Sequence, residues 1–407
     1  MYTFSSDLSK LEYDEFAQKH KNTTFFQSSQ WALVKNNWTP IYTGVYKDNK
    51  LVAASLILKR KLLFKYSFLY SPRGPLLDFE NKELLSFFLE NLKGVAKAHS
   101  ALSLTLDPYI IRAKYSMSQA IKDQAKITYD DSIVEYFEKA DFNHKSLGLE
   151  LHDTIQPRFQ PTIYFDEAAD FKNSRGYKNG IKARNSSVKI KRINLEDIDE
   201  FLAVIEKTEE HQNINLRGRT YFENLLTSFK DKSLISIAYL DLKAELESLV
   251  LRKSDMEKRL ENPNMREGRR REYESQLEKL KKDLVYINEQ QKIHGDQVNV
   301  AGVLALRSDS RSELLYAGMD RDFQNYLGSN LNYVDAMDWS IEADCTALCL
   351  GGSSGHFNDG ISRFKSSFDP ILEEYIGEFI FVNKKILNSI FNMMLKLREK
   401  ITYKPNN

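Results

Sequence analysis

The 407-residue sequence has few of the residues that carry metal or covalent chemistry, with only two cysteines and seven histidines. Cys345 and Cys349 lie in a segment that reads as a strand, where a spacing of four does not suit a disulfide, so we interpret them as reduced core thiols. The histidines show no metal-ligand spacing, which predicts no metal. Neither a Ser-His-Asp nor a Cys-His arrangement is recognisable, so we expect no covalent intermediate and no cofactor.

Long apolar segments and a strong net charge are also missing. The longest clean apolar run, 51–58, is too short to span a bilayer, and residues 1–15 lack the charged start and apolar core of a signal peptide. The sequence therefore predicts a cytoplasmic protein. A net charge of +1 gives no global attraction for nucleic acid, so any such contact must come from local patches. The hydrophobic content of 42% excludes a disordered chain, and the length allows two domains.

A long helical arm is predicted between residues 241 and 295. Apolar residues recur there at alternating spacings of four and three, in two series separated by Asn-Pro-Asn at 262–264. The two series are Leu242, Leu246, Leu249, Met256, Leu260 and Tyr273, Leu277, Leu280, Leu284, Ile287. Proline cannot donate a helical hydrogen bond, so the chain turns between them. The pattern predicts an antiparallel coiled coil, flanked by strands at 234–240 and 298–306.

Positive charge is concentrated in two segments. Around the tip of the arm, from Arg252 to Arg271, there are eight lysines and arginines against four acidic residues. The segment 171–194 contains eight more and no acidic residue. Such segments form a solvated surface or bind an anionic partner such as a phosphate backbone, and both interpretations fit here. The arm by itself is also compatible with packing or dimerisation.

The rest of the chain alternates predicted helices and strands, which is typical of an α/β fold. The segment 102–106 predicts a strand that ends at Asp107, where α/β proteins commonly bind ligands; capping of a following helix is the alternative role. The glycine-rich segment 351–355 lacks an ordered phosphate-binding pattern and predicts a plain turn. The tail, 384–402, predicts a basic amphipathic helix that packs on the protein body or lies on an anionic membrane.

Five short motifs occur in order around the predicted arm. They are Tyr-Ser-Pro-Arg-Gly-Pro-Leu-Leu-Asp (70–78), Leu-Asp-Pro-Tyr (106–109), Leu-Arg-Gly-Arg-Thr-Tyr (216–221), Leu-Tyr-Ala-Gly (315–318) and Arg-Phe-Lys (363–365). With this order, and with the arm between the third and fourth motifs, the whole chain resembles the FemABX family of peptidoglycan aminoacyltransferases. Within that family it resembles the MurM and MurN branch most.

The resemblance implies an α/β fold with two GNAT-like domains and an antiparallel coiled-coil arm inserted in the second. The expected first domain covers residues 1–150 and is completed by a C-terminal helix at 383–407. The expected second domain covers residues 151–382 and contains the arm at 241–295.

The resemblance also implies roles for particular residues. Asp107 would help to accept the proton of an attacking amine, and Lys365 would stabilise the negative oxygen that forms on attack, which makes both catalytic. Without the resemblance, Lys365 reads as a surface lysine at the start of a strand. Lys35 and Arg217 would hold the phosphates of the precursor. The full set of expected substrate-binding residues is Lys35, Trp38, Arg217, Tyr221, Tyr316 and Phe364.

The implied reaction moves an amino acid, alanine or serine, from aminoacyl-tRNA to the stem-peptide lysine branch of a peptidoglycan precursor, lipid II. We expect a monomer in peripheral contact with the inner face of the cell membrane. Two other functions are compatible with the residues. One is a GNAT-type N-acyltransferase that uses acyl-CoA, although residues 324–329 fit a phosphate-cradling turn poorly. The other is a non-catalytic tRNA-binding scaffold that uses only the arm.

Overall fold

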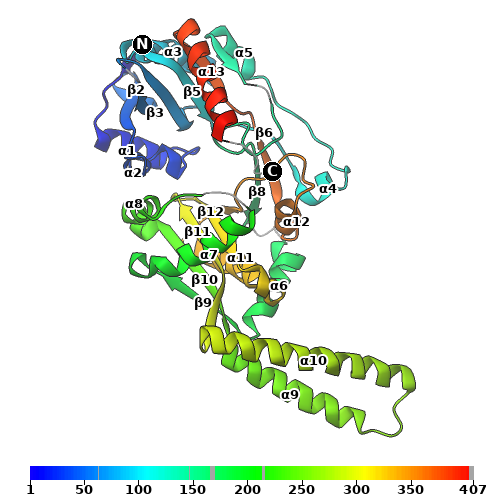
Figure 1. Cartoon of the computed structure of the whole chain (residues 1–407). Helices are drawn as coiled ribbons and strands as arrows, with labels where there is room; N and C mark the ends of the chain where they lie inside the picture. The colour runs from blue at the N-terminus through cyan, green and yellow to red at the C-terminus, as the bar shows by residue number, and fades with distance from the viewer. Residues whose placement is uncertain (63, 146, 166–169, 213–215, 403–407) are drawn as a thin grey trace.

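The computed structural model describes residues 1–62, 64–145, 147–165, 170–212 and 216–402, with side chains described as far as Met394 in the last helix. Two β-sheets form two lobes, one above the other in Figure 1, and a pair of long helices projects from the lower one. We call the lobe with the seven-stranded sheet the first lobe. The second lobe contains the eight-stranded sheet.

The first lobe has the strand order β1-β2-β3-β4-β5-β15-β7. Strands β4 and β5 are parallel, and the other neighbouring strands described in this sheet pair antiparallel. Its strands are β1 (Tyr2–Ser5), β2 (Thr39–Lys47), β3 (Lys50–Lys61), β4 (Ser67–Arg73), β5 (Ala101–Pro108), β15 (Phe379–Val382) and β7 (Phe142–His144). Its helices are α1 (Lys10–Lys19), α2 (Ser29–Val34), α3 (Lys82–Ala98), α5 (Val134–Lys139) and α13 (Lys385–Thr402). The apolar side of α3, which includes Leu85, Phe88 and Leu92, is buried against the sheet, as its helical spacing predicts.

The second lobe has the strand order β6-β14-β8-β13-β12-β11-β10-β9. Its strands are β6 (Ile111–Ser116), β14 (Ile371–Tyr375), β8 (Phe159–Tyr164), β13 (Ala347–Cys349), β12 (Arg311–Met319), β11 (Gln297–Arg307), β10 (Ser233–Asp241) and β9 (Val188–Ile193). Its helices are α4 (Met117–Ile121), α6 (Arg175–Arg184), α7 (Ile198–Gln212), α8 (Arg219–Phe229), α11 (Gly328–Glu342) and α12 (Gly360–Ser366). Short 3-10 turns occur at η1 (Phe25–Gln27), η2 (Phe171–Asn173), η3 (Leu195–Asp197), η4 (Lys230–Lys232) and η5 (Arg321–Tyr326).

The passage from β7 to β8 brackets the expected boundary at 150, but the chain also crosses between the lobes from β5 to β6 and from β14 to β15. β6 belongs to the second sheet because it pairs with β14, and β15 belongs to the first because it pairs with β5 and β7. A hydrogen bond from Ile376 N to Ile110 O, 3.0 Å long, holds the two crossings together. The pairing of backbone groups, which must be satisfied when buried, therefore decides the lobe of each strand. The crossing from β5 to β6 begins beside Asp107, and the crossing from β14 to β15 ends beside Glu378.

The predicted arm is confirmed as two helices, α9 (Leu242–Leu260) and α10 (Glu267–His294), which project from the lower lobe in Figure 1. They interrupt the antiparallel pair β10 and β11, whose last paired residues are Asp241 and Gln297. Asp241 also caps α9 by accepting a hydrogen bond from Ala244 N. Leu249 and Ile287 are buried between the helices, at the apolar positions that the sequence period marks.

The tail forms the predicted helix α13, drawn in red beside the first sheet in Figure 1. Its start is fixed by hydrogen bonds from Asn383 N and Lys384 N to Leu102 O on β5. The C-terminal helix therefore begins at the first lobe; residues 403–407 of the expected range lie outside the described residues. Across the described chain, every helix is too short or too polar to cross a bilayer.

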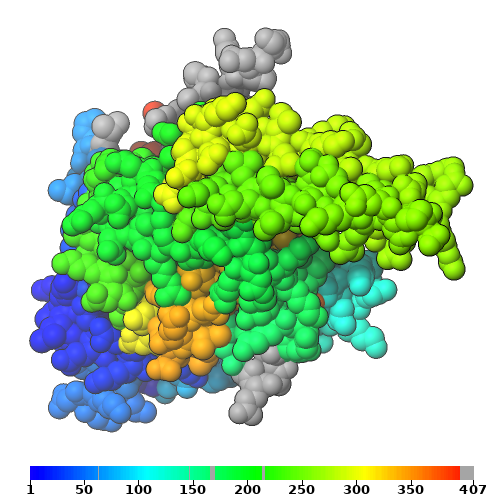
Figure 2. All heavy atoms as spheres, turned by 90° about the horizontal axis from the view of Figure 1, so that it is seen from below, coloured from blue at the N-terminus to red at the C-terminus, as the bar shows by residue number. Residues whose placement is uncertain are grey.

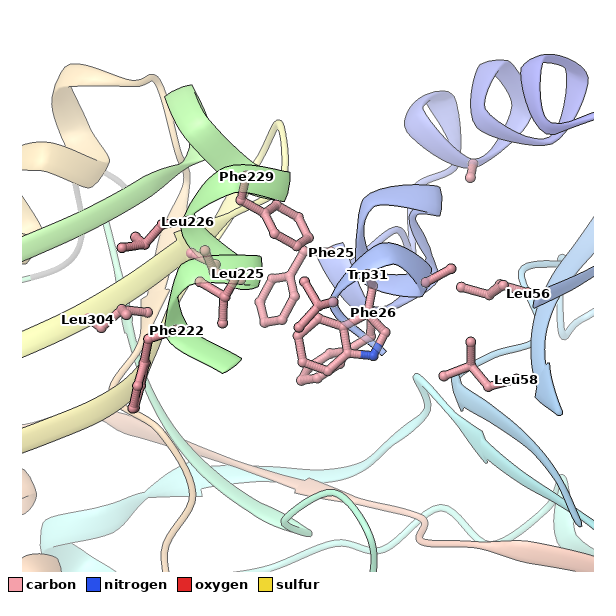
Figure 3. Packing of buried hydrophobic residues seen from close by; sticks show 14 of the residues in the cluster. Phe25, Phe26, Trp31, Leu56, Leu58, Phe222, Leu225, Leu226, Phe229 and Leu304 are labelled. Carbon is pink, nitrogen blue, oxygen red and sulfur yellow. The ribbon is translucent and has the colours of Figure 1, made fainter. Parts of the chain in front are cut away.

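The two lobes share one apolar core (Figure 3). From the first lobe come η1 and α2, with Phe25, Phe26 and Trp31; from the second comes α8, with Phe222 and Phe229. The rings of Phe25 and Phe229 meet edge to face, with centroids 6.1 Å apart. Because aromatic side chains bury large apolar areas, this interlobe core fixes α2 against α8.

We predict that Phe229→Ala lowers the free energy of unfolding by about 3 kcal/mol or more, because it leaves a cavity in the interlobe core. Urea unfolding measures the change. Phe64→Ala is the matched control, since Phe64 is 95% exposed and its removal leaves no cavity. Equal unfolding free energies for the two variants would contradict the interlobe core.

Candidate active site

A cationic group lies where α2 meets α8. Lys35 directly follows α2, and its Nζ lies 4.7 Å from the ring centre of Trp31 and 5.3 Å from that of Tyr221. Burial and the nearby charge of Arg217 lower the pKa of Lys35 to about 8. The two aromatic contacts attract the ammonium without neutralising it, so its charge is available to an anion.

Arg217 and two tyrosines complete this group. Arg217 precedes α8 and is exposed, with Cζ 5.4 Å from the ring centre of Tyr221. The Tyr221 ring meets that of Tyr316 on β12 edge to face, at 6.1 Å between centroids. Burial, together with Tyr316, raises the pKa of Tyr221 above its ordinary value, so Tyr221 is a neutral hydroxyl. We call Lys35, Arg217, Tyr221 and Tyr316 the cationic cluster.

Trp38 contacts the cationic cluster through its backbone. Its backbone N–H donates to Lys35 O at 2.8 Å, while its ring lies 5.8 Å from Cζ of Arg60 and packs against the interlobe core. Trp38 therefore supports the turn that carries Lys35. A direct contact of Trp38 with substrate stays a prediction.

Asp107 is buried at the end of β5, with 1% of its surface exposed. Its Oδ1 accepts from Arg73 Nη1 at 3.1 Å, and its Oδ2 accepts from the Tyr70 hydroxyl at 3.2 Å. Burial raises the pKa of Asp107 to about 7 against the opposing charge of Arg73, and the charge of Glu378 raises it further. The Asp107 carboxylate binds a buried arginine, and the element that follows β5 is the strand β6. Asp107 therefore does not cap a following helix.

Arg73 is a candidate site residue that the sequence did not reveal, although it lies within one of the five motifs. It is buried, and its guanidinium contacts the Asp107 carboxylate, the Pro157 carbonyl at 2.9 Å and the Tyr375 ring at 4.2 Å. Its φ of 52° lies in the left-handed region, which β-strand residues seldom adopt. The strained backbone at the end of β4 thus points a buried cation at Asp107.

Lys365 lies in α12, a helix capped by Asp359, and not at the start of a strand. Its side chain is buried, and Nζ donates to Gly351 O at 2.9 Å and to Gly352 O at 2.7 Å. Burial lowers the pKa of Lys365 to about 8. The glycine-rich segment is therefore more than a plain turn, because two of its carbonyls hold the ammonium.

Phe364 lies next to Lys365 on the same helix and packs into the second lobe. Its ring meets Tyr333 at 4.9 Å and Phe368 at 5.5 Å between centroids. The Phe364 ring is partly buried in this core. These contacts fix α12 on the lobe, so Phe364 helps to position Lys365; its contact with substrate stays a prediction.

Glu313 on β12 is a second candidate site residue that the sequence did not reveal. Burial raises its pKa to about 7, against the opposing charges of Arg73, Arg311 and Lys365. On β11, Leu306 pairs with Glu313 and Leu304 pairs with Tyr316. The two pairs are two residues apart on β11 but three apart on β12, because the register shifts between Leu304 and Ala305. Since residues two apart on β11 share a face, Glu313 and Tyr316 also share one. We call the buried Asp107, Arg73 and Lys365, together with the half-buried Glu313, the buried group. Strand β12 therefore links this group to the cationic cluster, over about 10 Å.

Acidic residues that are distant in the sequence form ion pairs with part of the basic segment at 171–194. The pairs are Arg184 with Asp338, Lys191 with Glu200, and Arg192 with Asp335 and Glu342. These carboxylates come from α11 and α7, so a count along the sequence could not reveal them. Within the described residues, no group of histidine, cysteine and acidic side chains has the geometry of a metal site.

The tip of the arm keeps its charge at the surface. Arg270 closes the turn by donating to Leu260 O at 3.1 Å and Asn262 O at 2.9 Å. Arg259 and Arg271 form ion pairs within their own helices. Figure 2 shows the end of the arm extending past the body of the protein, so its tip is accessible to a large partner.

Comparison with known proteins places this arrangement in a family. The model of the FemAB family matches residues 8–396. Aminoacyltransferase FemA of Staphylococcus epidermidis is 24% identical over 424 residues, which cover 97% of this chain and 98% of that protein. Aminoacyltransferase FemB of the same species is 24% identical over 418 residues, covering 97% of this chain and 99% of that protein.

The crystal structure of FemX superposes with a TM-score of 0.72 at 21% identity, covering 96% of this chain and 99% of that one. This likeness and the two sheets confirm the expected α/β fold with two lobes. The arm is inserted in the second lobe between β10 and β11. The closer placement in the MurM and MurN branch stays a prediction. Because the family model spans nearly the whole chain, this protein belongs to the FemAB family of aminoacyltransferases.

Proposed function

We propose that this enzyme transfers an amino acid, alanine or serine, from aminoacyl-tRNA to the stem-peptide lysine branch of the peptidoglycan precursor lipid II. The observation that supports this most is the division of the site into an accessible cationic cluster and a buried group with Asp107 and Lys365. The first suits the phosphates of a precursor, and the second suits acyl transfer.

The cationic cluster would hold the pyrophosphate of the acceptor. Arg217 can form two parallel hydrogen bonds to a phosphate, and Lys35 adds a second charge from the other lobe. The low pKa of Lys35, about 8, reflects burial and the charge of Arg217. A bound phosphate would relieve the repulsion between these two cations and raise that pKa. The acceptor would thereby bind across the interlobe contact.

The proposed reaction is a direct aminolysis. The nitrogen of the acceptor amine forms a bond to the ester carbon of the aminoacyl group, and the bond from that carbon to the ribose oxygen breaks. A free lysine amine has a pKa of about 10.4, so it needs a group that takes up its proton. Asp107, with a pKa raised to about 7, is a better acceptor than an ordinary aspartate. The nitrogen gives up two protons in all: one passes to the ribose oxygen that leaves, and the other is released to solvent.

Lys365 would stabilise the negative oxygen formed on attack. At neutral pH, a group with a pKa of about 8 is still mostly protonated, so Lys365 keeps its charge in a buried site. The Gly351 and Gly352 carbonyls fix the ammonium before the reaction. A preorganised donor of this kind contributes on the order of 3 kcal/mol to lowering the barrier.

The donor and the membrane complete the proposal. The basic, accessible tip of the arm suits the phosphate backbone of tRNA. A lipid-linked acceptor requires a cytoplasmic enzyme in peripheral contact with the inner membrane face. We propose that it acts there as a monomer.

Transfer of labelled alanine, serine or glycine from charged tRNA to lipid II, with or without one residue already added, tests the function. We expect label on one of these two acceptors, and the preferred donor identifies the amino acid. Free labelled amino acid and acetyl-CoA are the control donors. Transfer from acetyl-CoA alone would indicate an acyl-CoA enzyme, and no transfer despite tRNA binding would indicate a scaffold.

We predict that kcat/KM falls as the pH drops below about 7, because protonated Asp107 cannot accept the amine proton. Asp107→Asn should lower kcat/KM on the order of 100-fold and remove this acidic limb. The profile is measured between about pH 5.5 and 8.5. Asp123→Asn, at an exposed site, is the control and should keep the native profile. An unchanged acidic limb in Asp107→Asn would exclude Asp107 as its source.

A further inference from the structure

Helix α13 exposes its apolar side instead of burying it. Ile386 is 79% exposed, Ile390 45%, Met393 57% and Met394 58%. Spacings of four and three place these side chains on one face of the helix. A helix that only packs on its domain turns such a face inward, so this exposed face requires another explanation.

The opposite face of α13 contacts the first lobe. Asn388 is buried there, and the Phe391 ring lies 6.5 Å from that of Phe68 on β4. At 100° per residue, Asn388 points about 160° away from Ile390. The face with Asn388 and Phe391 therefore meets the protein, while the face with Ile386, Ile390, Met393 and Met394 points outward.

The turn between β3 and β4 adds a second apolar group beside α13. Phe64 is 95% exposed at this turn, four residues from Phe68. Because Phe68 contacts Phe391, the turn and the helix lie on neighbouring parts of one surface. We call the outward face of α13 together with Phe64 the apolar edge.

Positive charge predominates in the two segments that form the apolar edge. The segment 59–68 contains four lysines and arginines and no acidic residue, and the segment 384–398 likewise contains four and no acidic residue. Arg60, Lys61 and Lys65 are exposed at the turn, as are Lys384 and Lys385 at the start of the helix. Cations around an exposed apolar face complement a surface with negative head groups and an apolar interior.

We propose that the apolar edge is the membrane-binding surface of this protein, with α13 lying in the plane of an anionic lipid bilayer and Phe64 inserted beside it. This inference rests on the proposed function insofar as the acceptor is lipid-linked. It assigns the contact to particular side chains. The basic residues contact the lipid head groups, and the isoleucines and methionines enter the interface.

Co-sedimentation of the full-length protein with vesicles of equal parts phosphatidylglycerol and phosphatidylcholine tests the proposal. The triple variant I386S/I390S/M393S should partition roughly tenfold less, because binding scales with buried apolar area. The matched control V250S/L251S/V285S changes three exposed apolar residues on the arm and should bind as the native protein does. Raised salt and pure phosphatidylcholine should both weaken native binding.

Several outcomes would overturn the proposal. If the α13 variant binds vesicles as strongly as the native protein does, the apolar edge does not contact lipid. The same conclusion follows if the arm control loses as much vesicle binding as the α13 variant. A native dimer that the α13 variant turns into a monomer, as shown by sedimentation velocity, would make this face a contact between two copies.

The two proposals can fail separately. Transfer to a soluble nucleotide-linked precursor should be unchanged in the α13 variant, while transfer to lipid II in vesicles should fall with binding. Vesicle binding that depends on α13, without transfer from any charged tRNA, would refute the proposed function and still support the membrane surface.

Discussion

The packing of α2 against α8 is the contact on which the site depends. Phe25 and Trp31 of the first lobe bury their rings against Phe229 of the second, and Lys35 and Arg217 lie at the edges of the same two helices. Each lobe thus supplies one cation, and neither lobe alone forms the cationic cluster. Because the interlobe core is apolar and tightly packed, it can hold two like charges close together. Burial and the repulsion between the two charges lower the pKa of Lys35.

The exchange of strands between the sheets places the buried group at the boundary of the lobes. Asp107 ends a strand of the first sheet, Glu313 lies on a strand of the second, and Arg73 faces both. Ion pairs in such a site are sensitive to burial, and the pKa values of both carboxylates lie near neutrality. A fold that only had to be stable would gain little from them, whereas the acyl transfer that we propose could use such groups at neutral pH.

Features encoded by local patterns were predictable from the sequence. The period of Leu249 and its neighbours predicted the arm, and the alternation before Asp107 predicted its strand. Features that depend on distant partners were not: the pairing of β6 with β14, the carbonyls of Gly351 that hold Lys365, and the carboxylates that compensate the basic segment. The motifs located Tyr316, while the role of Glu313, three residues earlier, follows only from the register of β12 and the charges around it.

The separation of roles between the two groups is the central claim, and steady-state kinetics of Lys365→Met and Lys35→Met tests it most directly. The account predicts that Lys365→Met lowers kcat on the order of 100-fold and leaves the acceptor KM unchanged, because the lost contact forms only in the transition state. Lys35→Met should raise the acceptor KM about tenfold and largely keep kcat. The same pattern in both variants, or the reverse assignment, would contradict the account.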